Sequence, residues 1–158
     1  MISVCFVCLG NICRSPTAEG VLLHLIEQRG LQDQIEVDSA GTASYHVGES
    51  ADSRSAQAAK RRGIHLPSRA RQFRPADYER FDYVLACDNS NFSDLKSMAN
   101  GKHEDKLHMF LDFDPANPKG SSVPDPYYGG DQGFEHVLDL CESACNEFLD
   151  FIVEKHEL

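Results

Sequence analysis

The chain has 158 residues, a formal net charge of −10, 41% hydrophobic residues and 25% charged residues. These values are ordinary for one soluble globular domain with a substantial core, so we expect a single domain over residues 1–158. The negative charge argues against nucleic acid or an anionic membrane as a partner, because both attract basic surfaces.

The first predicted elements are a strand and a helix joined by a short loop. Residues 2–8 form an almost continuous apolar run rich in Val, which is typical of a central parallel strand covered on both faces. Ser15 before Pro16 predicts a helix N-cap, and Glu19 follows early in the helix, where the dipole favours negative charge. Apolar residues then recur at helical spacing up to Gly30, which predicts the end of this helix.

The pattern of a strand followed by a helix repeats along the middle of the chain. Residues 35–40 predict a second strand, and Asp52 predicts the cap of the helix after it. Residues 81–86 predict a third strand, followed by a helix over about residues 89–99. A weaker strand is expected near residues 107–111.

The last part of the chain contains a long loop and a helix. Residues 112–130 are rich in Pro, Gly, Asp and Ser, which is the composition of an ordered surface loop. From about residue 131 the apolar residues keep helical spacing for several turns and predict a core helix. Strands that alternate with helices indicate an α/β sandwich with a mostly parallel sheet. Its ligand site is expected beyond the carboxyl ends of the strands, where the loop of residues 8–15 also lies.

The N-terminal segment and the cysteines indicate a cellular location. The apolar start of residues 1–9 is too short to span a bilayer, and it lacks the basic beginning and the cleavage site of a secretory signal. We therefore expect a cytoplasmic protein without membrane insertion. The six cysteines are then expected to be thiols, because disulfide frameworks belong mainly to small exported domains.

The first loop carries a candidate anion site. Its sequence from Cys8 to Ser15 is CLGNICRS, which contains Cys-x5-Arg followed by a hydroxyl residue. This pattern is weak by itself, but here it lies between a buried strand and a helix N-terminus, where free N–H groups and the helix dipole bind phosphate. Gly10 and Asn11 tolerate the left-handed backbone angles that a loop wrapped around an anion requires.

The side chains of this loop suggest covalent chemistry. The guanidinium of Arg14 can hold two phosphate oxygens and stays charged throughout a transfer reaction. Helix N-terminus and arginine together favour a nucleophilic thiolate on Cys8. The hydroxyl of Ser15 can hydrogen-bond this thiolate before attack and during its departure.

Residues 7–16, with the sequence VCLGNICRSP, resemble the phosphate loop of the low-molecular-weight protein tyrosine phosphatases. The resemblance continues in family order through residues 38–41, 70–72, 81–83 and 125–129, and so covers nearly the whole chain. It implies a three-layer α/β/α sandwich with a central four-stranded parallel sheet (phosphotyrosine phosphatase I-like), without metal or other cofactor. It also implies hydrolysis of phosphotyrosine in proteins and of small aryl phosphates.

The resemblance implies a two-step mechanism. Cys8 would attack phosphorus and form a phosphocysteine, while Arg14 and the loop amides bind the phosphate. An acid must protonate the leaving oxygen. The composition of the long loop leaves Asp112, Asp114 and Asp125 as candidates, and the resemblance chooses Asp125 as general acid and base. The implied substrate-binding residues are Leu9, Gly10, Asn11, Ile12, Cys13, Ser15, Tyr45, Tyr127 and Tyr128.

The resemblance also implies roles around the loop. Asn11, Ser15 and Ser39 would support its shape through side-chain hydrogen bonds, whereas Ser68 stands at a position that is often histidine in the family. Cys13 would protect the nucleophile by forming a reversible disulfide with it. The expected partners are phosphotyrosine-containing proteins, with phosphate or other oxyanions bound in the loop.

Other functions are less consistent with these residues. An arsenate reductase on the same fold would need a cysteine relay, but Cys87 has no close second cysteine after it. A phosphocysteine carrier of a sugar-uptake system would not need Arg14 and Asp125, and a silent phosphotyrosine-binding module would need no nucleophile. Cys5 and Cys8 match a metal-binding spacing, but residues three apart on a strand point to opposite faces.

Overall fold

The computed structural model describes residues 1–127 and 129–158. A parallel sheet with the strand order β2-β1-β3-β4 forms its centre. The strands are β1 (Ile2–Cys8), β2 (Ile35–Gly41), β3 (Tyr83–Ala86) and β4 (Leu107–Met109). The helices are α1 (Arg14–Gln28), α2 (Ser53–Lys60), α3 (Asp77–Arg80), α4 (Asn89–Ala99) and α5 (Asp131–His156).

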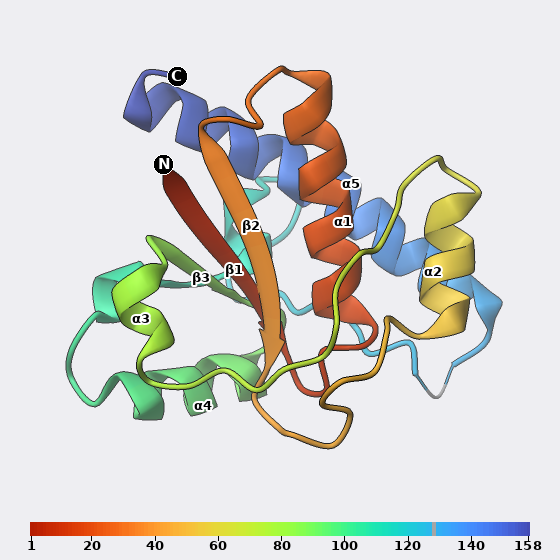
Figure 1. Ribbon diagram of the computed structural model, residues 1–158, viewed down its shortest axis with the longest axis horizontal. Coiled ribbons are helices and arrows are strands. Elements are labelled where there is room, and N and C mark those ends of the chain that lie inside the picture. The colour runs from red at the N-terminus through yellow and green to blue at the C-terminus, as the bar shows by residue number, and fades with distance from the viewer. Residues whose placement is uncertain (128) are drawn as a thin grey trace.

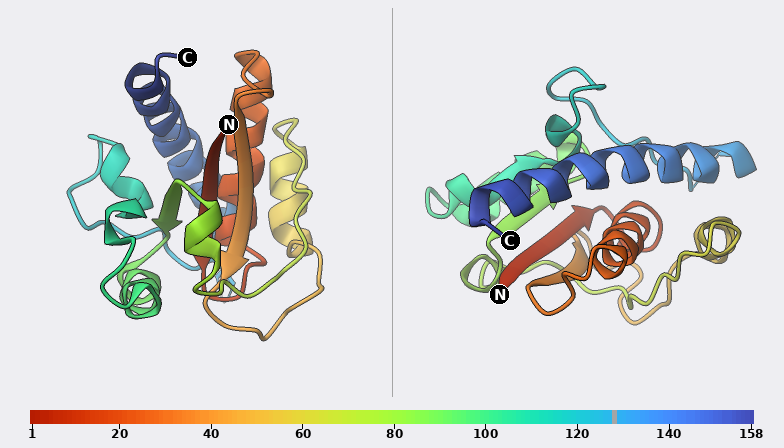
Figure 2. Two further views of the ribbon diagram at one scale, coloured as in Figure 1. Left: turned by 60° about the vertical axis from the view of Figure 1, so that its left-hand side comes forward. Right: turned by 90° about the horizontal axis from the view of Figure 1, so that it is seen from above.

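The helices cover the sheet on both faces (Figure 1). On one face α5 packs along α1 and also contacts α2, and on the other face α4 packs against β3 and β4. Figure 2 shows α5 extended along the length of this arrangement. The predicted three-layer sandwich with a four-stranded parallel sheet is therefore confirmed.

The central strand β1 explains why both faces need a cover. Val4 and Phe6 point into the core under α1 and α5, whereas Cys5 and Val7 point into the core under α3 and α4, and all four side chains are completely buried. An apolar run without polar alternation is thus what a strand between two helical layers requires. Because β1 is central, its carboxyl end delivers Cys8 to the middle of one edge of the sheet.

Both chain termini lie at the edge of the sheet opposite the loop that follows β1 (Figures 1 and 2). Within the described residues, no helix is both long enough and apolar enough to cross a membrane.

Most predicted elements occur where the sequence placed them, but the start of α1 differs. Ser15 does not cap the helix: Cys13 occupies the N-cap position without a side-chain hydrogen bond, and Ser15 lies inside the first turn. Glu19, which was expected to interact with the helix dipole, lies beyond the first turn of α1, and its buried side chain is hydrogen-bonded to Ser39 on β2. The prediction was wrong because both side chains bond to the loop and the sheet rather than to the helix terminus.

Three short elements were not predicted. These are α3, the 3-10 turn Glu104–Lys106 and the 3-10 turn Phe110–Phe113, which follows a fourth strand shorter than expected. Single turns of this length bury few apolar residues and therefore leave no clear periodicity in the sequence.

Candidate active site

The loop between β1 and α1 turns its amide groups inward. The carbonyl oxygens of Cys8, Leu9 and Ile12 accept backbone hydrogen bonds of 2.9, 3.0 and 2.8 Å from segments outside the loop. In a trans peptide the following N–H points the opposite way, toward the inside of the loop. One of the loop amides, the N–H of Asn11, points directly at the sulfur of Cys8 at 3.3 Å. The loop is therefore lined with donors, as an oxyanion site requires.

Asn11 fixes the shape of the loop through its backbone conformation and its side-chain hydrogen bonds. Its φ of 59° lies in the left-handed region. Its Oδ1 accepts the backbone N–H of Arg71 at 3.0 Å, and its Nδ2 donates to Ser15 Oγ at 2.8 Å and Ser39 Oγ at 2.9 Å. Gly10, for which we also expected left-handed geometry, does not adopt it. The tight curve of the loop thus depends on one residue whose side chain is fixed by three bonds.

Gly10 and Gly41 lie where the phosphate loop packs tightly against neighbouring segments. A Cβ on Gly10 would lie 3.0 Å from Cδ2 of His46, and a Cβ on Gly41 would lie 2.6 Å from the carbonyl oxygen of Leu9. Both positions therefore allow a neighbouring segment to approach the loop closely.

Cys8 lies at the bottom of the loop and is only 3% exposed. Its sulfur is 3.0 Å from Ser15 Oγ. Because Ser15 Oγ accepts the hydrogen bond from Asn11, its own hydrogen can point to the sulfur at 3.0 Å or to the more distant carbonyl oxygen of Ala40 at 3.4 Å. The sulfur thus has two donors beside it, an amide and a hydroxyl, and both stabilise the thiolate more than the thiol.

Arg14 connects the loop to two other segments. Its Nη1 donates to Asp88 Oδ2 at 2.6 Å and to the carbonyl oxygen of Val123 at 3.2 Å, and its Nη2 lies 3.8 Å from Asp125 Oδ2. The Arg14 side chain is 5% exposed. The guanidinium is therefore held at the edge of the pocket by the partly buried carboxylate of Asp88 and the carbonyl of Val123, with its other nitrogen toward the candidate acid.

Burial alone would lower the pKa of Arg14. The neighbouring ionisable thiols of Cys87 and Cys8 and the hydrogen-bonded carboxylate of Asp88 outweigh burial, so that the pKa of Arg14 lies above its ordinary value. Arg14 is consequently a permanent cation of this site.

Asp125 is placed by the backbone of its own turn. Its Oδ1 accepts the N–H of Tyr127 at 3.0 Å, and its side chain is 41% exposed. The ring of Tyr127 in turn lies 5.4 Å from the Arg54 guanidinium. Asp125 therefore faces the pocket from a braced turn. Tyr128, which we predicted to bind substrate, lies outside the described residues.

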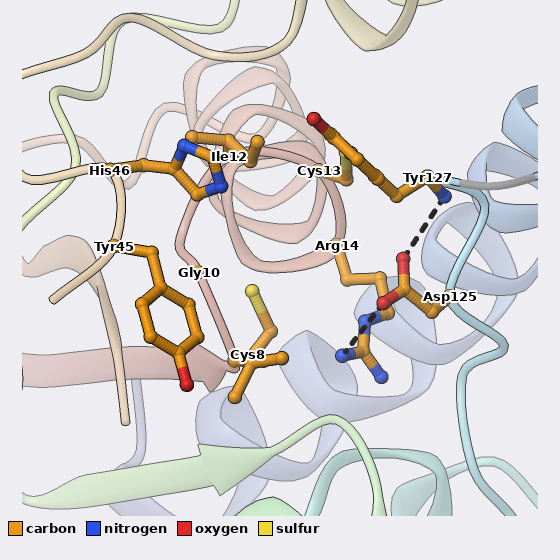
Figure 3. Close-up of a pocket in the computed structure, with 10 residues that line it drawn as sticks. Cys8, Gly10, Ile12, Cys13, Arg14, Tyr45, His46, Asp125 and Tyr127 are labelled. Atoms are coloured by element: carbon orange, nitrogen blue, oxygen red, sulfur yellow. Dashed lines mark hydrogen bonds and ion pairs between the residues drawn. The ribbon is translucent and has the colours of Figure 1, made fainter. Parts of the chain in front are cut away.

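The structure brings most predicted residues together in one pocket. It is lined by Cys8, Leu9, Gly10, Ile12, Cys13, Arg14, Tyr45, His46, Asp125 and Tyr127. Figure 3 shows Tyr45 and His46 on one side of the nucleophile and Asp125 and Tyr127 on the other. The predicted support residues Asn11, Ser15 and Ser39 do not line the pocket, and are buried around the loop.

The two sides of the pocket differ in exposure. Tyr45 is 75% exposed at the rim, whereas Tyr127 is partly buried. His46 Nδ1 is 2.8 Å from Glu49 Oε2, and its ring lies 6.2 Å from that of Tyr127. The mouth is thus bounded by aromatic rings on opposite sides, with Ile12 between them as an apolar surface (Figure 3).

The surroundings of Cys13 favour the neutral thiol. Burial, together with the negative charge of Asp52, raises the pKa of Cys13 to about 12, although the nearby hydroxyl of Ser55 acts against this shift. Its predicted disulfide with the nucleophile stays a prediction.

Two important residues were missed by sequence reasoning. Asp88, which holds Arg14, lies two residues after the end of β3, and the rule that parallel strands end at one edge of the sheet would have placed it beside the loop. Glu19 was assigned to the helix dipole, and no sequence signal shows that it reaches Ser39 instead.

A parallel α/β sheet with cysteine and arginine in an amide-lined loop at its carboxyl edge defines the class of oxyanion-binding α/β proteins. Residues 3–158 match the family model described as low molecular weight phosphotyrosine protein phosphatase. The chain belongs to this family.

Individual relatives agree with this membership. A low molecular weight protein-tyrosine-phosphatase of Streptomyces coelicolor is 42% identical over 156 residues, covering 98% of this chain and 95% of the relative. The crystal structure of a protein tyrosine phosphatase from Entamoeba histolytica has a TM-score of 0.93 at 40% identity and covers 100% of both chains. A drosophila arginine phosphatase has a TM-score of 0.86 at 34% identity, with coverages of 94% and 96%.

Proposed function

We propose that this protein hydrolyses phosphotyrosine in proteins, and small aryl phosphates, through a phosphocysteine intermediate on Cys8. The observation that carries the proposal is the loop itself, in which inward amides and Arg14 surround a buried sulfur that accepts the N–H of Asn11 and lies 3.0 Å from the hydroxyl of Ser15. Such donors stabilise an equatorial phosphoryl oxygen and a thiolate in the same place.

In the first step Cys8 Sγ forms a bond to phosphorus as the bond from phosphorus to the tyrosine oxygen breaks. Asp125 transfers its proton to that oxygen, and tyrosine leaves neutral. In the second step Asp125 accepts a proton from water, the water oxygen attacks phosphorus, and the sulfur leaves as a thiolate beside Ser15. Arg14 and the amides hold the phosphoryl oxygens in both steps, and inorganic phosphate is the product.

The walls of the pocket support an aromatic substrate. Ile12, Tyr45 and Tyr127 present apolar surface on the path to the sulfur. A phenyl ring fills such a slot, whereas the short side chain of phosphoserine would leave the walls without contact. The cationic guanidinium of phosphoarginine, the substrate type named for one structural relative, would have to be desolvated against these same apolar walls. We therefore favour phosphotyrosine over phosphoarginine.

The test measures turnover of p-nitrophenyl phosphate and of phosphotyrosine, phosphoserine and phosphoarginine peptides. Cys8→Ser should abolish turnover. Asp125→Asn should lower kcat for phosphotyrosine by about a hundredfold or more, and less for p-nitrophenyl phosphate, whose leaving group needs little protonation. Asp131→Asn, at the exposed start of α5, removes the same charge outside the pocket and is the matched control.

Each result has a defined meaning. Turnover by Cys8→Ser at the wild-type rate would show that the nucleophile is wrong. An equal loss for both leaving groups in Asp125→Asn would show that this residue is not the acid. Faster turnover of the phosphoarginine peptide than of the phosphotyrosine peptide would overturn the substrate assignment.

A further inference from the structure

Glu19 is a buried carboxyl group with no role in the mechanism above. It lies on α1, one helical turn after Ser15, and is 6% exposed. Its Oε1 accepts a hydrogen bond of 2.5 Å from the hydroxyl of Ser39 on β2. A buried carboxyl group is costly unless the protein uses its hydrogen-bonding capacity, so its partners indicate its role.

The partners of Glu19 lead directly to the nucleophile. Ser39 Oγ accepts from Asn11 Nδ2 at 2.9 Å, the same Nδ2 donates to Ser15 Oγ at 2.8 Å, and Ser15 Oγ lies 3.0 Å from Cys8 Sγ. Three side chains therefore connect the carboxyl group to the sulfur, and all of them are at most 1% exposed.

The directions of the hydrogen bonds that join Asn11, Ser39 and Glu19 follow from the donors available. The backbone N–H of Arg71 donates to Asn11 Oδ1, so that the amide nitrogen of Asn11 must face both serines. Ser39 accepts from that nitrogen and gives its only hydrogen to Glu19. Glu19 is thus the acceptor that completes the bonding of Asn11, the residue on which the tight curve of the loop depends.

The charges around Glu19 do not compensate a carboxylate. It is faced by Asp38 on β2, by the buried thiol of Cys5 on β1 and by the guanidinium of Arg71. Arg71 is committed to Asp38 at 3.2 Å and to Asp77 at 3.1 Å. The pKa of Glu19 is raised to about 7. Burial is the largest cause and raises it, the hydrogen bond from Ser39 lowers it, the charge of Asp38 raises it and the charge of Arg71 lowers it.

A protonated carboxyl group on Glu19 can still accept the hydrogen bond that Ser39 donates. Its carbonyl oxygen still accepts from Ser39, so the bonds to Asn11 stay in place. An ionised Glu19 would add a negative charge to the surroundings of a site that must already hold a thiolate and a phosphate ester dianion. The neutral form of Glu19 therefore favours the state in which Cys8 can react.

We propose that Glu19 is a positioning residue of this enzyme, whose protonated carboxyl group holds the Ser39–Asn11–Ser15 chain on Cys8 and whose ionisation lowers activity. This inference rests on the proposed function for its consequence in catalysis. The arrangement of the chain itself does not depend on the substrate.

The test compares pH profiles of kcat/KM for p-nitrophenyl phosphate in wild type and Glu19→Gln. Glutamine keeps an acceptor oxygen for Ser39 but cannot ionise. All other ionisable groups of the site are the same in both proteins, so the ratio of variant to wild type isolates Glu19. We expect this ratio to rise about five- to tenfold between pH 6 and pH 8. Glu27→Gln, which removes the same charge from an exposed position of α1, should give a constant ratio.

A second variant tests the hydrogen-bond chain. Glu19→Ala leaves Ser39 without its acceptor and should lower kcat about tenfold at every pH, with a smaller change in KM, because the geometry of the nucleophile is affected more than binding. A residue needed only for folding would change the yield of active protein but not the shape of the Glu19→Gln profile. Superimposable profiles of Glu19→Gln and wild type would overturn the proposal.

Two measurements do not depend on turnover. Alkylation of Cys8 by iodoacetamide, followed by mass spectrometry, should have its pH midpoint at a lower pH in Glu19→Gln than in wild type, because removal of a nearby negative charge favours the thiolate. If that variant does not fold, NMR of wild type labelled at the glutamate carboxyl carbons should show one group that titrates near neutral pH. Titration of every glutamate below pH 5.5 would overturn the proposal for Glu19 even if the enzyme is an active phosphatase. If wild type is inactive but Glu19→Gln still shifts the alkylation midpoint, the proposed function would be wrong instead.

Discussion

Replacing Glu19 by glutamine should remove a pH dependence from the free energy of unfolding. The pKa of Glu19 is raised by burial from 4.5 to about 7. A carboxyl group whose pKa is higher in the folded than in the unfolded protein stabilises fully below the unfolded value, and this stabilisation is lost as the pH rises through the folded value. With about 1.4 kcal/mol for each pKa unit, the shift of about 2.5 units corresponds to roughly 3 kcal/mol lost between pH 4.5 and 7.

Urea unfolding of wild type, Glu19→Gln and Glu27→Gln at pH 5 and pH 8 measures this effect. Wild type and Glu27→Gln should lose roughly 3 kcal/mol more than Glu19→Gln between these two values. Asp52 and Glu135, whose pKa values are lowered by hydrogen bonds with arginines despite some desolvation, act at lower pH and are common to all three proteins. An equal loss in all three proteins would show that Glu19 ionises normally and would refute the reasoning from its burial.

Three other substitutions test separate parts of the structure. Asp88→Asn removes the carboxylate that holds Arg14 and should raise the inhibition constant of inorganic phosphate several-fold, with little change in unfolding midpoint; an unchanged constant would show that Arg14 needs no such partner. Gly41→Ala places a Cβ 2.6 Å from a carbonyl oxygen of the phosphate loop and should lower kcat at least tenfold in a protein with normal circular dichroism, whereas wild-type kcat would show that the loop tolerates displacement. Tyr78→Phe removes a buried hydrogen bond of 2.7 Å to the carbonyl oxygen of Leu95 and should destabilise by about 1–2 kcal/mol in urea without changing kcat/KM; no loss of stability would contradict the importance of this bond.

The fold could be predicted from the sequence because its long elements carry strong periodic signals. The apolar run of β1 and the helical spacing of α5 gave the correct bounds at their starts, and α4 occurs over the predicted residues 89–99. The family resemblance implied four parallel strands, but the order of these strands within the sheet was not predicted. Strand order is decided by contacts between distant segments, which leave no periodic pattern in a single sequence.

The candidate site could be predicted in part. Cys8 and Arg14 belong to one short loop whose position between strand and helix already indicates an anion site. The neighbours that decide how this loop works come from elsewhere: Asp88 follows another strand, and Glu19 acts through its burial. Whether a carboxyl group in a helix meets water or a buried hydroxyl is settled by packing, which the chain order does not specify.

Arg14 Nη1 donates a hydrogen bond to the carbonyl oxygen of Val123, which lies 109 residues later in the chain. Val123 in turn donates its N–H to the carbonyl oxygen of Cys87. The guanidinium that would grip phosphate is therefore also a clamp for the segment that carries Asp125. Binding of the anion and placement of the proton donor are mechanically coupled through this side chain. Lysine is also a cation but lacks the second nitrogen, so it could keep only one of these contacts, either with the phosphate or with the segment that carries Asp125. An Arg14→Lys variant should therefore lose more activity than a weakened phosphate contact alone would explain.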